Sequence, residues 1–199
     1  MPRETPEPVV DQRRPPLVLG IDPGTLNLGY AVLALVPNGP RLYRCGVLKA
    51  PAKQPIAQRL ARLHVQLEEL FAEVGPQAVA VERAFAGANV HSALRLGEAR
   101  GIALALAARS GAEVAEYSPS QAKKCVLGHG GASKEQVARS LCVQLGLPDL
   151  DLPADASDAM ALAWTHVREL EMRALRERAR TSTLAAPDSV ASNGPEGVR

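Results

Sequence analysis

The stretch Leu17-Val18-Leu19-Gly20-Ile21-Asp22-Pro23-Gly24 decides how the chain folds. Its apolar and branched residues predict a short buried strand. Pro23 and Gly24 are turn residues, and a second apolar run over 29–36 returns after them. Asp22 is therefore expected at the carboxyl end of a strand, where it either opens the turn or takes part in chemistry.

Composition and charge limit the class of protein. A chain of 199 residues, 46% of them hydrophobic, suits one domain, with or without tails. A net charge of +2 does not by itself indicate a nucleic-acid partner, so any such site must come from local clustering. The 3 cysteines form no C-x-x-C pair, and no apolar run approaches the ~20 residues of a membrane span. We expect a cytoplasmic protein with reduced thiols and no membrane partner.

Periodicity predicts an α/β domain over 17–175, with a flexible leader over 1–16 and a disordered tail over 176–199. Strands are expected at 17–21, 29–36, 41–49, 78–81 and 114–117. Helices are expected from Ile56 to about 75, from Asn89 or Ser92 to about Arg109, and over 118–127, 133–146 and 155–175. The first three strands would form an antiparallel meander, and the last two follow helices, as parallel strands do. The result is a five-stranded mixed sheet flanked by helices.

Four acids stand where they could meet at one edge of this sheet. Glu82 ends the fourth strand as Asp22 ends the first, so the two are neighbours if these strands lie side by side. Asp155 and Asp158 are three residues apart and share one helical face, although capping of the helix explains them equally well. Carboxylates gathered in one pocket repel one another unless hard divalent cations neutralise them. Mg²⁺, or Mn²⁺ in its place, is therefore the expected cofactor, and two such ions can activate water for phosphodiester hydrolysis.

Five segments stand out in order along the chain. They are Gly20-Ile21-Asp22-Pro23-Gly24, Val81-Glu82-Arg83-Ala84-Phe85, 89–101, Gln121-Ala122-Lys123 with 128–134, and Asp155-Ala156-Ser157-Asp158-Ala159 with 163–166. Together they resemble the RuvC family of Holliday junction resolvases, which are crossover junction endodeoxyribonucleases. The resemblance covers roughly Leu17 to Arg168, and five segments in order at compatible spacing are a specific match.

The resemblance implies an RNase H-like fold and a homodimer that resolves four-way DNA junctions in recombination and repair. It implies two symmetric metal-dependent nicks, with Asp22, Glu82, Asp155 and Asp158 as catalytic and metal-binding residues. Two ions per subunit are expected, and the resemblance also implies a RuvA–RuvB branch-migration complex as partner. Sequence leaves open whether Asp155 is a ligand or a base that orients water.

The same resemblance assigns DNA contacts to Phe85, Lys123 and Lys134. Core burial is the alternative for Phe85, although exposed aromatic side chains can contribute ~1–3 kcal/mol per stacked base. Ala86 and Ala88 stand where family members often carry a second aromatic residue and a lysine. Arg83 is expected to compensate for them, whereas His129 is expected to be solvated.

Basic residues lie on both sides of the expected pocket, which favours contact with phosphates. One group follows the fifth strand and the other follows Glu82; they comprise Lys123, Lys124, Lys134 and Arg139, and Arg83, Arg95 and Arg100. The apolar helix around 93–106 either packs on a second subunit or is buried in the monomer.

Two other functions compete with a nuclease. The segment Gly20-Ile21-Asp22-Pro23-Gly24-Thr25 resembles the first phosphate loop of actin-like and sugar-kinase-like ATPases, but the chain has no second loop or second domain of that kind. A non-catalytic nucleic-acid-binding or regulatory protein on the same fold is the second alternative. The presence of all four acids argues against it.

Overall fold

The computed structural model describes residues 15–83, 90–148 and 152–184, with side chains described as far as Thr181. The chain divides into two compact units, Met1–Arg168 and Glu169–Arg199. The first unit contains the sheet and the candidate site, and the second is described by itself below.

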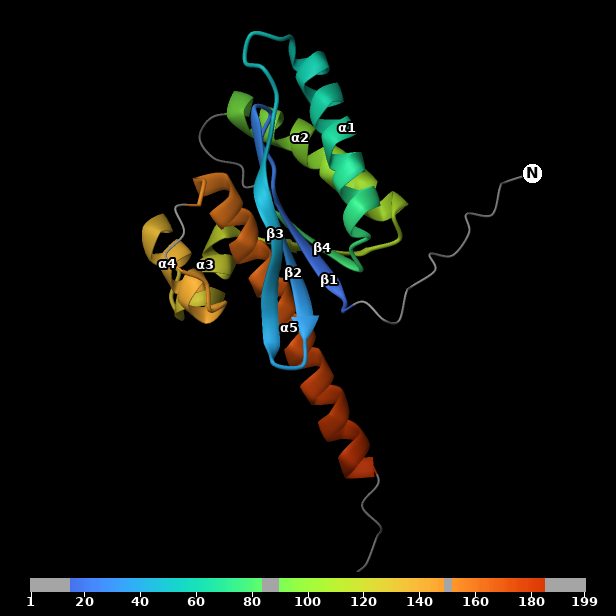
Figure 1. Ribbon diagram of the computed structural model, residues 1–199, viewed down its shortest axis with the longest axis vertical. Coiled ribbons are helices and arrows are strands. Elements are labelled where there is room, and N and C mark those ends of the chain that lie inside the picture. Colours follow the sequence, from blue (N-terminus) through green and yellow to red (C-terminus); the bar gives the residue numbers. More distant parts are fainter. Residues whose placement is uncertain (1–14, 84–89, 149–151, 185–199) are drawn as a thin grey trace, which may run out of the picture. The chain divides into compact units, whose positions relative to one another are not determined.

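The five strands form one mixed sheet in the order β3-β2-β1-β4-β5 (Figure 1). β1 (Leu17–Asp22), β2 (Asn27–Val36) and β3 (Gly39–Lys49) pair antiparallel, as the meander predicted. β4 (Ala78–Glu82) lies parallel between β1 and β5 (Glu113–Tyr117). Because β1 pairs with β4, Asp22 and Glu82 stand at the ends of neighbouring strands, as the sequence predicted.

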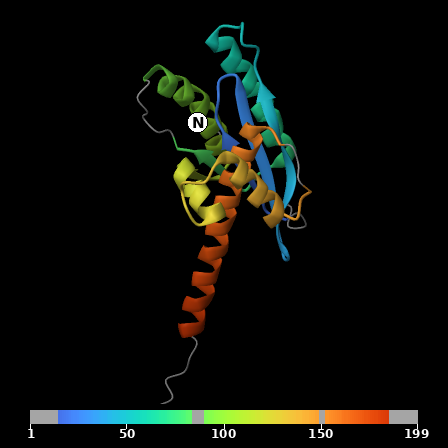
Figure 2. The ribbon, with the colours of Figure 1, turned by 90° about the vertical axis from the view of Figure 1, so that its left-hand side faces the viewer.

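Helices α1 (Ile56–Val74) and α2 (Val90–Arg109) cover one face of the sheet. Alternate residues of the central strands, such as Ile21 and Val81, join the buried core with apolar residues of these two helices. The opposite face, which Figure 2 turns toward the viewer, carries α3 (Pro119–Leu127), α4 (Lys134–Gln144) and the first part of α5 (Ala154–Leu184). The site lies on this second face.

Capping boxes open α3 and α4. Ser118 accepts a hydrogen bond from the backbone of Gln121, and Ser133 accepts one from the backbone of Gln136, while each Gln side chain accepts from the backbone of its serine. These pairs satisfy backbone N–H groups that a helix start otherwise leaves without partners. The expected helix starts at Ser118 and Ser133 are confirmed, and they position Lys123 and Lys134.

Helix α5 is longer than expected from the sequence. It runs to Leu184 rather than ending near Leu175, so 176–184 is helical. Good helix formers explain the extension, because Ala, Arg, Glu and Leu dominate the added segment and an Arg180–Glu177 ion pair lies along it. The predicted helix ended too early because 176–184 has no apolar periodicity, and that absence was read as the end of the helix.

Three predictions concern residues outside the described ranges: the leader up to Arg14, a helix cap at Asn89, and the tail beyond Leu184. Within the part of the chain that is described, no helix has both the length and the apolar character needed to cross a membrane.

Candidate active site

Two glycines allow α5 to lie directly on the sheet. An ideal Cβ on Gly20 would lie 2.0 Å from the carbonyl oxygen of Ala159, and one on Gly29 would lie 2.0 Å from that of Asp155. Neither glycine has a positive φ, so the close approach and not the backbone conformation requires glycine here. The contact brings the start of α5, with Asp155 and Asp158, to the carboxyl ends of β1 and β4.

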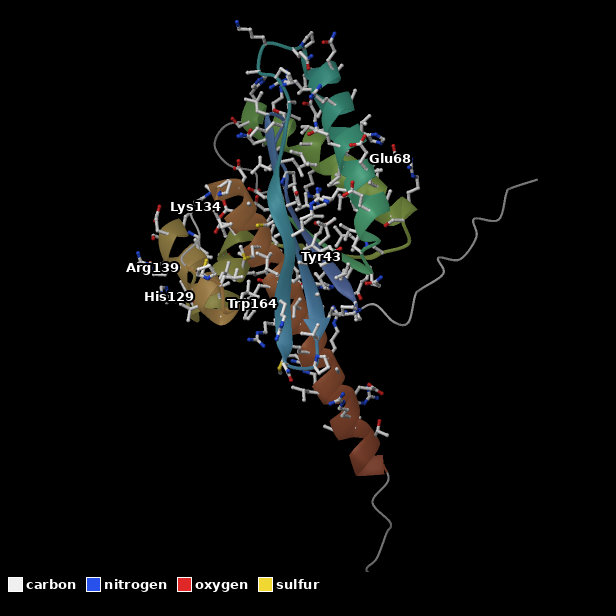
Figure 3. All side chains as sticks on the ribbon, viewed as in Figure 1. Tyr43, Glu68, His129, Lys134, Arg139 and Trp164 are labelled. Atoms are coloured by element: carbon white, nitrogen blue, oxygen red, sulfur yellow. The ribbon has the colours of Figure 1, made fainter. Side chains whose placement is uncertain are left out.

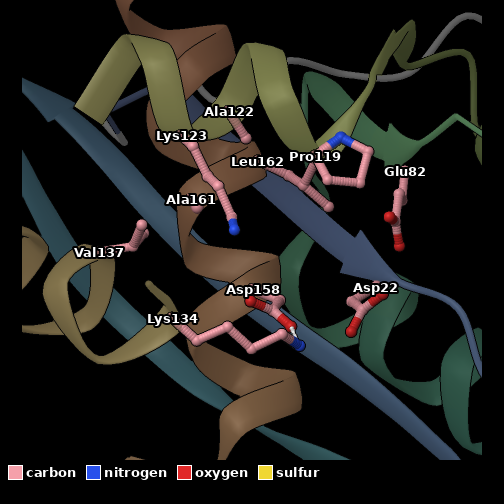
Figure 4. A pocket seen from close by; sticks show the side chains of 10 residues that line it. All are labelled: Asp22, Glu82, Pro119, Ala122, Lys123, Lys134, Val137, Asp158, Ala161 and Leu162. Carbon is pink, nitrogen blue, oxygen red and sulfur yellow. Dashed lines mark hydrogen bonds and ion pairs between the residues drawn. The ribbon is translucent and has the colours of Figure 1, made fainter. Parts of the chain in front are cut away.

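Asp22, Glu82 and Asp158 line one cavity of about 220 Å³ (Figure 4). The other lining residues are Pro119, Ala122, Lys123, Lys134, Val137, Ala161 and Leu162. Three acids from β1, β4 and α5 thus face a hollow bordered by two lysines from α3 and α4. This arrangement brings together residues that are more than 130 positions apart in the sequence.

Asp22 has an unusual ionisation. Burial is the largest cause that raises its pKa, from 3.8 to about 8, and hydrogen bonding to Glu82 and the charges of Glu82, Asp158 and Asp155 add to it. The raised pKa favours a protonated Asp22 in the metal-free protein. A perturbed carboxyl in a cleft with named charge partners is typical of a functional site.

Lys134 supplies the positive charge nearest to Asp158. Its Nζ donates a hydrogen bond to Asp158 Oδ2, and this bond is the main reason that the pKa of Lys134 is raised. Lys123 points into the same cavity, and its Nζ donates to the carbonyl oxygen of Ala132 at 2.8 Å. Both lysines therefore border the acids and are already held by protein groups.

Asp155 is placed differently from the other three acids. It lies close enough to raise the pKa of Asp22, but it does not line the cavity. Across the described ranges, no three His, Cys, Asp or Glu side chains are arranged as a ready metal cage. The expected tetrad thus gathers at one edge of the sheet, with three members facing the cavity.

The donor set suits a hard divalent cation. Every acidic ligand candidate offers oxygen only, which is the preference of Mg²⁺ and Mn²⁺ rather than of zinc or copper. The ammonium group of Lys134 gives Asp158 the positive charge that a bound cation would otherwise supply. A cation in its place would meet the carboxylates of Asp22, Glu82 and Asp158, so these residues fit such a group.

The other residues expected to contact DNA are either exposed or lie outside the described ranges. Arg83 is exposed and donates to the backbone carbonyl of Glu116 at 3.2 Å, and Lys124 is exposed on α3. Arg139 and His129 are also exposed, around α4 (Figure 3). Phe85, Ala86 and Ala88 lie outside the described residues, so the expectations for them stay predictions.

One member of the expected basic group serves another purpose. Arg100 donates to the carbonyl oxygen of Glu82 at 3.2 Å and to Glu116 Oε2 at 2.5 Å. Sequence reasoning had placed Arg100 among the phosphate contacts and had not considered Glu116. Side chains alternate between the two faces of a strand, so Glu116 shares a face with Val114. This period was the one signal in the sequence that Glu116 faces a helix.

Comparison with known proteins gives a consistent match. The model of the family described as crossover junction endodeoxyribonuclease RuvC matches residues 18–166. A protein of that name from Chlorobium phaeovibrioides is 41% identical over 150 residues, which cover 74% of this chain and 78% of the relative. Another from Anaeromyxobacter is 43% identical over 152 residues, covering 76% and 72%.

Solved structures agree with the sequence match. Thermus thermophilus RuvC in complex with a Holliday junction substrate superposes with a TM-score of 0.73 at 36% identity, covering 79% of this chain and 96% of that one. The yeast mitochondrial Holliday junction resolvase shares the fold, with a TM-score of 0.62 at 18% identity, covering 87% and 88%. The expected RNase H-like mixed sheet flanked by helices is confirmed.

Proposed function

The chain belongs to the RuvC family of crossover junction endodeoxyribonucleases, and from this membership we propose that it resolves four-way Holliday DNA junctions in recombination and repair. Two symmetric nicks, one in each of two opposed strands, separate the junction into duplexes. The observation that carries the proposal is the cavity where Asp22, Glu82 and Asp158 converge beside Lys123 and Lys134. A family match alone would be consistent with a protein that has lost its activity, whereas this cavity keeps the acidic groups together.

Mg²⁺ is the proposed cofactor, with Mn²⁺ able to substitute, and two ions per subunit are proposed. Asp22, Glu82 and Asp158 would hold them, and Asp155 either joins the ligands or orients water. When bound, the ions supply a more acidic water and stabilise charge on the leaving oxygen. The product ends are a 5′-phosphate and a 3′-hydroxyl.

The chain's own groups prepare the site for this chemistry. The side chain of Asp22 is held by Glu82 and by burial, so it must give up its proton before it can bind a cation with full charge. Lys123 and Lys134 approach from α3 and α4, where ammonium groups attract the DNA phosphates. Arg83, Lys124 and Phe85 complete the proposed DNA contacts.

A homodimer is proposed because a junction has near two-fold symmetry and two nicks need two sites. An exposed face of α2 supports it: Val90 is 70% exposed and Leu94 63% exposed, and the space above Gly97 and Gly101 is open. These residues lie three to four apart, so they form one stripe away from the face that packs on the sheet. A second copy of the chain is the proposed occupant of this stripe.

Two further assignments complete the proposal. A RuvA–RuvB branch-migration complex is the proposed partner, because a resolvase acts on junctions that such a complex moves. The cytoplasm is the proposed location, since the substrate is cellular DNA.

Cleavage of a labelled four-way junction tests the proposal. Wild-type protein with Mg²⁺ should nick two opposed strands, and removal of the metal should stop nicking. Asp22→Asn should bind the junction but cut it at least about 10²-fold more slowly. Wild-type protein that binds the junction in metal without nicking it would instead support the non-catalytic binding function.

A further inference from the structure

Arg100 lies behind the sheet, on the side opposite the acidic cavity. Val81 pairs with Glu116 and Glu82 pairs with Tyr117 in the register of β4 and β5. Because side chains alternate along a strand, Val81 and Glu116 face α2 while Glu82 faces the cavity. Arg100 comes from α2, so it reaches the backbone of Glu82 from the side away from the reacting groups.

One guanidinium group holds two partners at the ends of neighbouring strands. Arg100 Nε donates to the carbonyl oxygen of Glu82 at 3.2 Å, and Arg100 Nη2 donates to Glu116 Oε2 at 2.5 Å. The planar fork of arginine allows both bonds in one orientation, whereas the single ammonium of lysine does not reproduce this geometry. The side chains are only 20% and 34% exposed, so solvent competes weakly for these bonds.

The peptide that follows Glu82 is held on both sides. Arg83 N donates to the carbonyl oxygen of Tyr117 at 2.8 Å, which extends the pairing of β4 with β5 by one residue. Arg100 holds the carbonyl oxygen of the same peptide. Glu82 is the last residue of β4, and Arg100 donates to its carbonyl oxygen at this end of the strand.

The charge of Arg100 is also already balanced. Glu116 forms a partly buried ion pair with it, so a phosphate would have to displace a carboxylate and a backbone carbonyl to bind there. Arg109, on the same helix, differs: it pairs with Glu68 of α1 on the surface. The two arginines can therefore be separated by experiment.

We propose that Arg100, fixed by Glu116, is a positioning residue that sets the direction of the Glu82 carboxylate, and is not a DNA contact. The inference rests on the proposed nuclease function, in which Glu82 is a ligand or base that must be held within about 0.5 Å of its working position. Loss of a group that orients a ligand typically lowers metal affinity or activity about 10- to 100-fold.

The test compares Arg100→Gln, Arg100→Lys and Glu116→Gln with Arg109→Gln as the matched control. Single-turnover cleavage of a labelled junction at saturating protein gives the chemical rate, and junction affinity in EDTA over a range of salt gives the DNA contacts. The Mg²⁺ concentration for half-maximal rate is the third measurement. Wild-type protein must cut the junction in the same assay, because its failure would count against the proposed function and not against the role of Arg100.

Arg100→Gln should cut about 10- to 100-fold more slowly and need more Mg²⁺, with junction affinity and its salt slope within about twofold of wild type. Arg100→Lys should restore only part of the rate, Glu116→Gln should lower it in the same direction, and Arg109→Gln should match wild type. Weaker binding with a smaller salt slope in Arg100→Gln would make Arg100 a phosphate contact and overturn the inference. An unchanged cleavage rate in Arg100→Gln would overturn the inference as well. If Arg100→Gln does not fold, the other two variants decide. A wild-type rate and a wild-type Mg²⁺ requirement in both Arg100→Lys and Glu116→Gln would then overturn it.

Discussion

Gly20 and Ala159 touch through their backbones: a Cβ on Gly20 would lie 2.0 Å from the carbonyl oxygen of Ala159 and 2.7 Å from the N atom of Ala163. At this point the strand that carries Asp22 and the helix that carries Asp158 approach each other backbone to backbone. The close approach of the two acids therefore depends on the absence of a side chain at Gly20, as it does at Gly29.

Gly20→Ala should destabilise the fold and displace Asp158 from Asp22. We expect a loss of about 1–3 kcal/mol or more in the free energy of unfolding, because backbone atoms of a buried helix cannot yield as a flexible side chain can. Urea denaturation measures the loss. Gly131→Ala is the matched control, since its nearest neighbour would lie 4.0 Å away, and it should stay close to wild type.

Metal-free protein should become less stable as pH rises from about 4 to 8. Folding raises the pKa of Asp22 from 3.8 to about 8, with burial as the main cause, so the folded state keeps a proton that the unfolded state releases in this window. The stabilisation from this proton is fully present below the pKa of Asp22 in the unfolded state and is lost as the pH rises through its pKa in the folded state. The free energy of unfolding falls by at most about 1.4 kcal/mol per pH unit in this window. Asp22→Asn should remove this part of the slope, as thermal unfolding in EDTA at several pH values would reveal. Parallel curves for the two proteins would contradict the assigned ionisation.

Metal binding should release a proton at neutral pH. A cation that takes up Asp22 must displace the proton held there, so we expect release of about one proton per site at pH 7. Isothermal titration with Mn²⁺ in two buffers of different ionisation enthalpy measures this number. Asp22→Asn should bind weakly and release none, and Glu82→Gln should also bind more weakly.

Lys134→Ala should weaken junction binding at every sequence and reduce the slope of log K against log salt by about 1. Lys123→Ala should act in the same direction, since its Nζ faces the same cavity. Electrophoretic mobility shifts over a range of salt give the slope. Lys53→Ala, in the loop between β3 and α1, is the control, and a slope unchanged in both site variants would remove these lysines from the interface.

Leu94→Glu should separate the proposed dimer. A charge in the middle of the exposed stripe on α2 opposes packing against a second copy, so sedimentation should show monomer where wild type shows dimer. Paired nicking should fall with it. Val65→Glu, a comparable change at a 52% exposed position on α1, should leave the assembly intact.

Local signals in the sequence were sufficient for most elements. The apolar runs around Asp22 and Glu82, the helix starts at Ser118 and Ser133, and the helix end near residue 75 depend on residues within a few positions of one another, and the structure confirms them. The end of α5 was misjudged because an exposed helix of good helix formers has no apolar period to mark it.

The sequence by itself determined which acids and lysines the protein has and on which kinds of element they stand. Only the tertiary structure decided which of them meet, because strand order, the Gly20–Ala159 contact and the placement of Arg100 depend on pairs far apart in the chain. It also decided that the pKa of Asp22 is raised, since burial and neighbouring charges are properties of the folded cavity and not of an aspartate in sequence.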